Sequence, residues 1–427
     1  MRIALALAGL VAIFGWLTSA SKSDAQELRG HGGPVRAVAI SANGATAVTG
    51  SFDQSAIRWN LGKGSADAVL RGHDGAVNAA AALPDGGFAT ASEDGAILLW
   101  DADSHAPRQK LDGHTAPVAG LAASPGGKLL ASASWDGSIR LWDMPAGTER
   151  SVLKGHRGNV NAVAFLNDET LISGGYDATL RLWSGGVETQ VISLPSPVNR
   201  VETFSGGFVA ASADGALRFY AQNGAELGLL QIGSAPLVSL ALTRDGKRGV
   251  AGSIDGKIVL FDPVRRSVIA EKQSRGWPAW SLAFLPDGSQ FLSGGGDRIV
   301  RRWDGTDAEA LSNPVSPATD DIPADLRDTR GAQVYRACAA CHTLTEHAGP
   351  RAGPTLHRIM GRRIATGPNY DYSDALKRLD IVWTKETISK LFEVGPSAYT
   401  PGTKMPEQIV REEDRIALVE FLAKATQ

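Results

Sequence analysis

The sequence has little cysteine and, beyond its N-terminus, no long hydrophobic run. Its 427 residues include two cysteines, Cys338 and Cys341. A framework of several disulfides, such as stabilises small secreted domains, is therefore excluded, and the folded parts must depend on apolar cores. After residue 17 the chain is interrupted every few residues by Gly, Asp or Arg. No later stretch reaches the roughly 20 apolar residues that span a bilayer.

A strong excess of either charge is also absent. The chain contains 43 Lys+Arg and 45 Asp+Glu, without the clustered basic residues of a nucleic-acid interface, so we expect no nucleic-acid partner. The balance is uneven, because residues 326–427 carry 15 basic and 12 acidic side chains and the rest carry 28 and 33. This mild positive balance is compatible with a negatively charged partner, although three charges do not define a binding face.

The N-terminus has the pattern of an export signal. Met1-Arg2 precedes an apolar run from Ile3 to Leu17, and small residues follow, with candidate cleavage sites after Ala20 and Ala25. We predict a signal peptide over residues 1–25 and, in a bacterium, a periplasmic mature protein without a membrane span. An uncleaved signal anchor is the alternative.

The two cysteines belong to the sequence Cys338-Ala339-Ala340-Cys341-His342. This is the spacing for covalent attachment of haem c: each thiol adds to a haem vinyl group, and the next residue places an imidazole beneath the iron. A zinc site would need further thiolates or paired histidines, and a thioredoxin-like redox site would need a βαβ setting. Neither accompanies the motif, so we predict one haem c with His342 as an iron ligand.

A motif that starts with Asp and ends in an aromatic residue recurs seven times between residues 28 and 304. Gly-His pairs open the first four units, and short β-rich runs within each unit are separated by Gly, Asn and Asp turns. The aromatic residues follow one another at intervals of 37 to 42 residues and are Trp59, Trp100, Trp142, Trp183, Tyr220, Phe261 and Trp303. The period, the Gly-His pairs and the Trp-Asp pairs together resemble WD40 repeats.

The resemblance implies an all-β, seven-bladed propeller over residues 26–311, because one four-stranded blade cannot bury both of its faces alone. In this family the first strand of the chain usually completes the last blade; residues 26–29 could supply it, and residues 307–311 compete for the place.

The family also implies buried networks of His, turn Asp and Trp with a strand hydroxyl, which makes the four histidines structural: His31/Asp53/Trp59, His73/Asp94/Trp100, His114/Asp136/Trp142 and His156/Asp177/Trp183. Blades five to seven have Leu194, Gly233 and Arg275 at the histidine position, so we expect them to lack the network.

Two further segments follow from composition. Arg275-Gly-Trp277-Pro-Ala-Trp280 combines an arginine and two tryptophans with a Pro turn, and it should lie in a loop on the face where the blade entrances cluster. Such residues are frequent at binding hot spots, but they also pack between blades. Residues 312–324 contain three prolines and no apolar periodicity, which predicts a semi-extended linker.

From residue 325 to 427 the sequence resembles class I cytochrome c, closest to the mitochondrial and bacterial c2 type. Gly331 precedes the haem motif, and Leu418, Phe421, Leu422 and Ala425 recur at helical spacing near the C-terminus. The resemblance implies an all-α domain in which the N- and C-terminal helices cross, with Gly331 against Leu418 and Phe421.

The resemblance also assigns the remaining haem contacts. The Pro354 carbonyl should accept a hydrogen bond from His342 and fix its ring. Met405, in the segment Tyr399–Pro406, should be the sixth iron ligand. Met360 is the competing methionine of the domain, and we expect it to pack in the hydrophobic core. The residues that match propionate-binding positions are Arg362, Tyr372, Ser373 and Trp383; core packing is the alternative for the two aromatics. Leu376 replaces an asparagine of the family, which leaves the reduction potential undetermined.

These expectations favour a periplasmic carrier of single electrons. Its haem iron would have both axial positions filled, and its propeller would dock a protein partner beside the redox donor and acceptor. One alternative is an oxidoreductase whose propeller oxidises a small molecule and passes the electrons to the fused haem. A second is a redox-sensing scaffold, whose partner affinity would depend on the oxidation state of the haem. We expect an electron carrier, not an enzyme.

Overall fold

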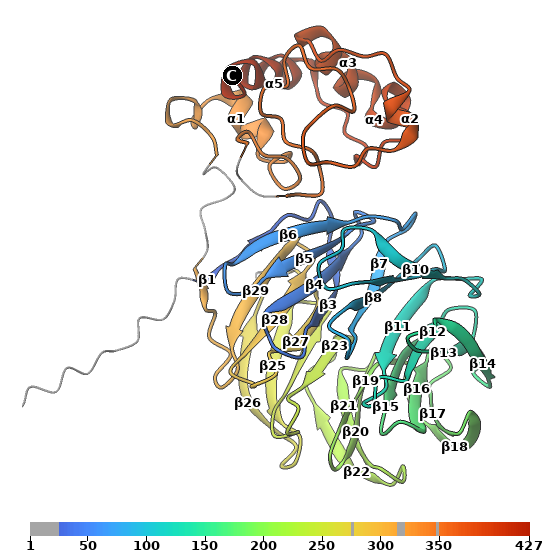
Figure 1. Cartoon of the computed structure of the whole chain (residues 1–427). Coiled ribbons are helices and arrows are strands. Elements are labelled where there is room, and N and C mark those ends of the chain that lie inside the picture. Colours follow the sequence, from blue (N-terminus) through green and yellow to red (C-terminus); the bar gives the residue numbers. More distant parts are fainter. Residues whose placement is uncertain (1–24, 275–276, 314–320, 347–349) are drawn as a thin grey trace, which may run out of the picture.

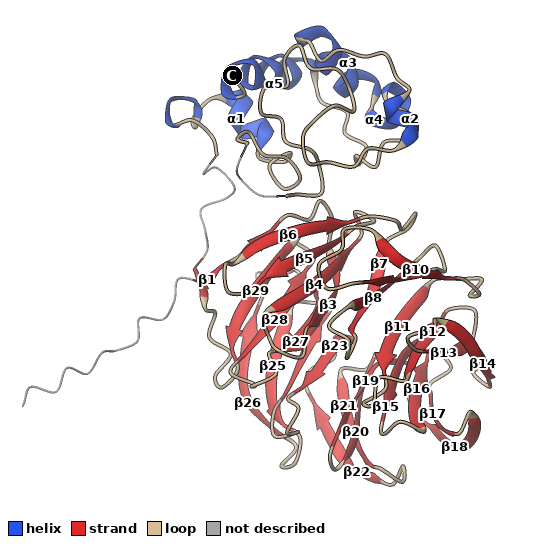
Figure 2. Ribbon diagram, viewed as in Figure 1, coloured by secondary structure: helices blue, strands red, loops and turns tan. Residues whose placement is uncertain are grey.

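The computed structural model describes residues 25–274, 277–313, 321–346 and 350–427. A β-propeller is followed by a separate helical domain that lies over one end of the blades (Figure 1 and Figure 2). The predicted signal peptide falls, apart from its last residue, outside the described residues. Among the helices of the described part, none is long and apolar enough to cross a membrane.

The propeller has the seven blades that the repeats predict, each an antiparallel sheet of four strands. The innermost strands consist mostly of small apolar residues, and the motif that ends in an aromatic residue supplies the third strand of each blade. The first four blades are β3 (Val35–Ile40), β4 (Thr46–Ser51), β5 (Ala56–Asn60), β6 (Ser65–Leu70); β7 (Val77–Ala82), β8 (Phe88–Ser92), β9 (Ile97–Trp100), β10 (Pro107–Leu111); β11 (Val118–Ala123), β12 (Leu129–Ser134), β13 (Ser138–Asp143), β14 (Thr148–Lys154); and β15 (Val160–Phe165), β16 (Thr170–Gly175), β17 (Thr179–Ser184), β18 (Val187–Ser193). Blades five to seven are β19 (Val198–Phe204), β20 (Gly207–Ser212), β21 (Ala216–Ala221), β22 (Glu226–Gln231); β23 (Leu237–Leu242), β24 (Gly249–Ser253), β25 (Lys257–Asp262), β26 (Ser267–Gln273); and β27 (Ala279–Phe284), β28 (Gln290–Gly295), β29 (Ile299–Asp304) with a fourth strand from the N-terminus.

The N-terminal segment closes the ring of blades. Strand β2 (Leu28–Arg29) pairs antiparallel with β29, so the first of the two candidate segments completes the seventh blade. The buried Glu27 carboxylate, beside β2, forms an ion pair with the Arg301 guanidinium of β29 at 3.2 Å. The competing segment contributes an isolated bridge from Ala310 to Trp303. Strand β1 (Ala25–Gln26) pairs with β30 (Ser312–Asn313), which places the start of the predicted linker against the N-terminus.

The four predicted histidine networks are present. In the third blade, His114 Nδ1 lies 2.7 Å from Asp136 Oδ2, and the Ser132 hydroxyl lies 2.8 Å from His114 Nε2 and 2.9 Å from Trp142 Nε1. Burial alone would raise the pKa of Asp136, but hydrogen bonds from Ser138 and His114 outweigh it and lower the pKa to about 2. The equivalent hydroxyls in the other three blades are Thr49, Thr90 and Ser173.

The last three blades lack the histidine of the network, as the sequence predicts, and their turn aspartates have other partners. In the fifth blade the turn aspartate Asp214 pairs with Arg218, and in the seventh Asp297 pairs with Arg301. In the sixth blade the hydroxyl of Ser253 donates to Asp255. A guanidinium from the third strand therefore replaces the imidazole in two of these blades. Both groups can donate N–H hydrogen bonds to the carboxylate of the turn aspartate.

One end of the propeller, which we call the entrance face, is formed by the loops before the innermost strands and by the turns between the second and third strands. Backbone hydrogen bonds tie these two sets together, for example from Phe52 N to Pro34 O at 3.1 Å and from Tyr176 N to Asn159 O at 2.8 Å. Trp277 lies on this face and is 52% exposed. Trp280 points instead into the central channel of the propeller, which the innermost strands surround. Arg275 lies outside the described residues. The helical domain sits on this face (Figure 1).

The helical domain consists of η1 (Ala324–Leu326), α1 (Arg330–Tyr335), α2 (Asp374–Lys377), α3 (Lys385–Val394), α4 (Pro396–Tyr399) and α5 (Glu412–Ala425), joined by long loops, with one isolated bridge between Arg363 and Val382. Helices α1 and α5 pack against each other as expected, with Gly331 against Ala417 and Phe421. A Cβ at residue 331 would collide with the Ala417 carbonyl oxygen. Leu418 is fully buried in the core, where Ile322 also packs. The end of the predicted linker therefore belongs to this domain.

Substituting Ser132 by alanine should destabilise the propeller. The change leaves His114 Nε2 and the Trp142 indole N–H without their buried partner, at a cost of about 1–3 kcal/mol for each unsatisfied group. Urea unfolding followed by tryptophan fluorescence measures the loss. Ser289→Ala is the matched control, because that exposed hydroxyl bonds only to the neighbouring Asp287. Equal stability of the two variants would contradict the structural role of the network.

Candidate functional site

The Cys-x-x-Cys-His segment forms a tight turn that continues from α1. The Ala339 N–H donates to the Tyr335 carbonyl at 3.0 Å, and the His342 N–H donates to the Cys338 carbonyl at 2.9 Å. This helical winding places Cys338 and Cys341 on one turn, with Cys338 buried and Cys341 partly buried. Both thiols therefore face one ligand, and the imidazole follows directly behind them.

Backbone contacts fix the ring of His342. Its Nδ1 lies 2.7 Å from the carbonyl oxygen of Pro354, which is the predicted hydrogen bond and makes Nδ1 the protonated nitrogen. The ring also lies against Gly353, where a Cβ would come within 2.5 Å of Cε1. Burial lowers the pKa of His342. The imidazole is thus neutral near pH 7, and its Nε2 has no hydrogen-bond partner within the described part of the chain.

Two side chains that the sequence did not single out hold this turn in place. The guanidinium of Arg351 donates to the carbonyls of Ala339 and His342, and the Tyr335 hydroxyl donates to the same His342 carbonyl at 3.0 Å. Tyr335 is fully buried, and burial raises its pKa. No sequence motif marks these roles, because both side chains bind backbone oxygens whose position depends on the folded turn.

The motif opens onto a cavity of about 860 Å³. Its volume lies within the 300–1,000 Å³ of typical cofactor sites, and its walls are mostly apolar. All nine residues that the sequence predicts for the site line this one cavity: Cys338, Cys341, His342, Pro354, Arg362, Tyr372, Ser373, Trp383 and Met405. The competing methionine, Met360, packs against the hydrophobic core of the domain and is not among the lining residues.

Met405 reaches the cavity from the loop between α4 and α5. The Met405 N–H donates to the Thr403 hydroxyl at 3.1 Å, and Gly402 turns the loop with a φ of +83°. Ser373 ties the loop to α2, since its hydroxyl donates to the Gly402 carbonyl at 2.9 Å and also caps α2. The loop can therefore hold a thioether at a fixed place on the cavity wall.

The remaining polar lining residues are partly engaged by the protein. The Arg362 guanidinium donates to the carbonyls of Thr355 at 2.7 Å and His357 at 3.0 Å, and burial lowers its pKa. Burial raises the pKa of Tyr372, whose hydroxyl lies near Gly367. Trp383 packs against the domain core and also faces the cavity. Both expectations for Trp383, core packing and contact with a ligand, fit this position.

The two thiols are protonated near neutral pH. Burial raises the pKa of Cys338 to about 12 and, with the negative charge of Asp53, the pKa of Cys341 to about 11. Metal binding and thiol–disulfide exchange use the thiolate and favour lowered pKa values. Among the described residues, moreover, no group of three or more His, Cys, Asp or Glu side chains could hold a metal ion. The geometry therefore does not favour the zinc and redox-disulfide alternatives.

The propeller closes one side of the cavity, which the sequence did not predict. Gly32 lies so close to the Sγ of Cys341 that a Cβ would collide with it. The other lining residues from the propeller are Asp53, Gln54, Ser55, Arg71 and Arg298, from the entrance face of the first and last blades. The site therefore belongs to both domains.

Several contacts hold the domains in this arrangement. The Ala352 N–H donates to the Gly30 carbonyl at 2.9 Å, and the Arg71 guanidinium donates to the Ala352 carbonyl at 2.6 Å. The same guanidinium lies 4.2 Å from the ring centroid of Tyr370. Lys404, next to Met405 in sequence, donates to the His73 carbonyl and lies 3.7 Å from the Asp74 carboxylate.

Comparison with known proteins covers both parts of the chain. The family model "Cytochrome c" matches residues 329–426. Cytochrome c of Stellaria longipes is 38% identical over 100 residues, which are 23% of this chain and 92% of the relative. The chain belongs to the cytochrome c family. Cytochrome c 2.1 of Caenorhabditis elegans is 38% identical over 104 residues (24% of this chain, 91% of the relative), and cytochrome c2 of Rhodomicrobium vannielii is 35% identical over 95 residues (22% and 75%).

The propeller precedes this cytochrome c domain as an additional unit. The model "WD domain, G-beta repeat" matches residues 22–60, 64–101, 106–143, 147–184 and 272–304. The matched segments leave out residues 185–271, which include the fifth and sixth blades, two of the three blades in which the structure shows other partners for the turn aspartate. The predicted combination of WD40 propeller and cytochrome c domain is thus confirmed.

A covalently bound haem c follows from membership of the cytochrome c family. The cavity fits this group: two neutral thiols lie on one turn, an unbonded imidazole nitrogen lies beside them, and most of the lining is apolar. Bound there, haem c supplies an iron that alternates between two oxidation states.

Replacing Gly32 by valine should separate the cytochrome c domain from the propeller, because the new side chain cannot fit beside Cys341. We expect the haem to become more accessible, so that a small anionic reductant reduces it several-fold faster in stopped-flow experiments. Gly158→Val is the matched control, since it changes the corresponding loop of the fourth blade where nothing lies within 4 Å. Unchanged kinetics in Gly32→Val would show that the propeller does not shield the haem edge.

Proposed function

We propose that this protein is an exported carrier of single electrons, in which the haem iron is held by His342 and Met405 and the propeller docks a redox partner. Its cytochrome c domain transfers electrons, as the family does. The observation that supports the axial ligation is that His342 and Met405 line one cavity, with the His342 ring bonded to the Pro354 carbonyl and the Met405 N–H bonded to the Thr403 hydroxyl.

Ligation by His342 and Met405 explains why a carrier is favoured over a catalyst. The hydrogen bond from Nδ1 to Pro354 leaves Nε2 of His342 as the nitrogen that can bind iron. A thioether on the other side fills the sixth position and raises the reduction potential. With both positions filled, the iron has no open site for a substrate, and electrons must pass through the haem edge.

The proposed location outside the cytoplasmic membrane depends on the sequence. The apolar run from Ile3 to Leu17 and the small residues that follow have the form of a cleaved signal. Attachment of haem c in bacteria takes place in the same compartment. The proposed mature protein is therefore periplasmic.

The substitution Met405→Ala tests the carrier assignment. The reduced wild-type protein should bind carbon monoxide slowly, because the thioether must dissociate first, whereas the variant should bind it rapidly. The weak near-infrared band of sulfur-bound ferric iron should also disappear. The protein is purified from the periplasmic fraction, and its mass reports both the attached haem and the cleavage site.

Met360→Ala is the matched control for this experiment, because Met360 packs against the core of the same domain. It should keep the near-infrared band and the slow reaction. Rapid binding of carbon monoxide to the wild-type protein would contradict ligation by methionine and leave the iron open to substrates.

The proposed docking role concerns the entrance face. Apolar side chains stand exposed at the same turn position in several blades: Phe52 is 40%, Trp135 39% and Tyr176 64% exposed. Aromatic residues of this kind are enriched at protein interfaces. Asp53 and Gln54, which follow Phe52 in the same turn, line the haem cavity. A partner bound to these aromatics would therefore lie close to the haem edge.

A photo-reactive amino acid at position 176 should capture the redox partner in the periplasm. The same residue at position 187, an exposed apolar site on strand β18, is the control. The captured protein must exchange electrons with the purified haem protein, and Tyr176→Ala must slow that second-order rate at least several-fold. A captured protein whose electron exchange is unaffected by Tyr176→Ala would exclude this face as the docking site.

A further inference from the structure

The central channel of the propeller contains a second polar site, remote from the haem ligands. Each innermost strand has a register shift at its second residue, where one residue is inserted into the pairing with the next strand. Such bulges redirect a side chain out of the regular alternation. The inserted residues that line the channel cavity include Arg36, Asn78, Asn161 and Trp280.

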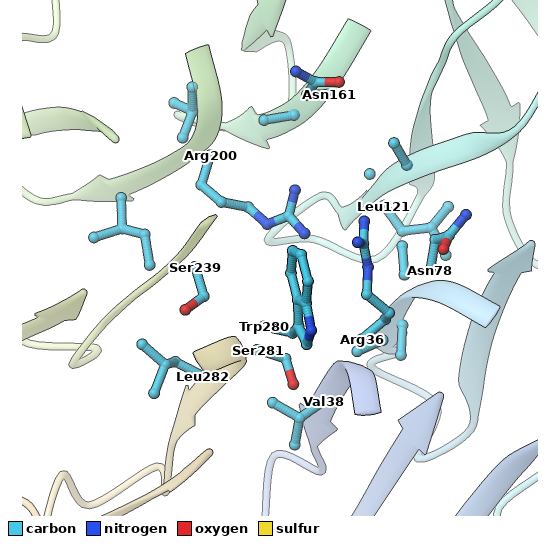
Figure 3. Close-up of a pocket in the computed structure, with 18 of the residues that line it drawn as sticks. Arg36, Val38, Asn78, Leu121, Asn161, Arg200, Ser239, Trp280, Ser281 and Leu282 are labelled. Atoms are coloured by element: carbon cyan, nitrogen blue, oxygen red, sulfur yellow. The ribbon is translucent and has the colours of Figure 1, made fainter. Parts of the chain in front are cut away.

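Two arginines and a tryptophan from three blades project into this cavity (Figure 3). Arg36 comes from β3, Arg200 from β19 and Trp280 from β27. The guanidinium carbon of Arg36 lies 4.5 Å from the ring centroid of Trp280 and 5.4 Å from that of Phe52. These aromatic rings hold the guanidinium in place without neutralising its charge.

The positive charge of the site is not balanced by the protein. Within the described part of the chain, neither Arg36 nor Arg200 forms an ion pair with a carboxylate, and Arg200 donates only to the carbonyl of Asn199, at 2.9 Å. Burial and repulsion from Arg36 lower the pKa of Arg200 to about 10. The nearby Glu202 does not compensate fully, because burial raises its pKa to about 7.

Several polar atoms around the two arginines also lack partners. Arg36 Nε, Asn78 Oδ1 and the Ser281 hydroxyl oxygen are buried, and no described protein group hydrogen-bonds to them. Buried polar groups are normally satisfied, and two like charges held close together with incomplete compensation from Glu93 and Glu202 are costly. An acceptor-rich anion would accept from Arg36 and Ser281 and separate the two guanidinium charges, whereas Asn78 Oδ1, itself an acceptor, would need a donor such as water or a protonated group of the ligand.

We propose that the channel cavity binds a small oxyanion, a phosphate or a short carboxylate, between Arg36 and Arg200. Guanidinium groups bind both kinds of oxyanion through paired N–H donors. The cavity of about 110 Å³ admits a group of this size and no larger cofactor. The site stands independently of the haem ligation. The propeller would thus bind a ligand separate from the haem. Residues 30–34, which precede Arg36 in the chain, connect this site to Gly32 in the wall of the haem cavity.

Isothermal titration of the haem-loaded full chain with phosphate, sulfate, succinate and acetate, each at constant ionic strength, tests the proposal. At least one anion should bind with a stoichiometry near one. The order of the four affinities shows whether the site prefers phosphate-like or carboxylate ligands. Arg36→Gln and Arg200→Gln should each weaken binding at least tenfold. Arg265→Gln, at an arginine whose side chain is 83% exposed, should leave it unchanged.

Two measurements keep the proposal testable if a glutamine variant folds poorly. Arg36→Lys and Arg200→Lys retain the charge but lose the paired donors, so they should bind with intermediate affinity. The thermal unfolding temperature of the wild-type protein should rise with the concentration of the bound anion and not with that of chloride. Absence of binding by the wild-type protein, or equal binding in folded Arg36 and Arg200 variants, would overturn the proposal. Both outcomes leave the haem spectrum, and hence the electron-carrier assignment, unaffected.

Discussion

The close contact between Gly32 and Cys341 is the constraint on which the two-domain arrangement depends. Only a residue without a side chain lets the loop of the first blade reach the Sγ of the second haem cysteine. Once it is there, Gly30, Arg71 and Lys404 can make their cross-domain contacts, and the propeller becomes a wall of the haem cavity. The propeller thereby covers one side of the haem cavity.

This arrangement gives a physical reason for joining the two domains in one chain. An isolated cytochrome c domain would expose the motif turn and the methionine loop on the same side. Here Lys404, next to the proposed iron ligand Met405, is held by His73 and Asp74 of the propeller. Electron exchange must then either use a part of the haem edge that the propeller leaves uncovered or require the domains to separate. A redox partner docked on the entrance face would favour the first route.

The haem attachment site and the histidine networks could be predicted from the sequence, because each depends on residues at short, fixed spacings. The turn of Cys338 to His342 needs five consecutive residues, and the His342–Pro354 hydrogen bond was expected from the family spacing and is present. The histidine networks of the first four blades follow in the same way from a fixed interval. The packing of α1 on α5 was expected from the family, whereas the contact of Gly331 with Ala417 was not. Gly331 meets Ala417, because the exact rotation of two helices depends on the packing of all their side chains.

The sequence by itself determined the haem attachment motif, the seven repeats and, through the resemblance to cytochrome c, nine of the residues that line the haem cavity. Each of these is a pattern over a few residues or a regular period, and such patterns dictate local backbone geometry and burial. The tertiary structure alone decided that Gly32 completes the cavity, that Leu28–Arg29 close the ring and that Arg36 and Arg200 face each other. These residues are distant in sequence and carry no shared motif. Their proximity results from the closure of the propeller and from the docking of the two domains.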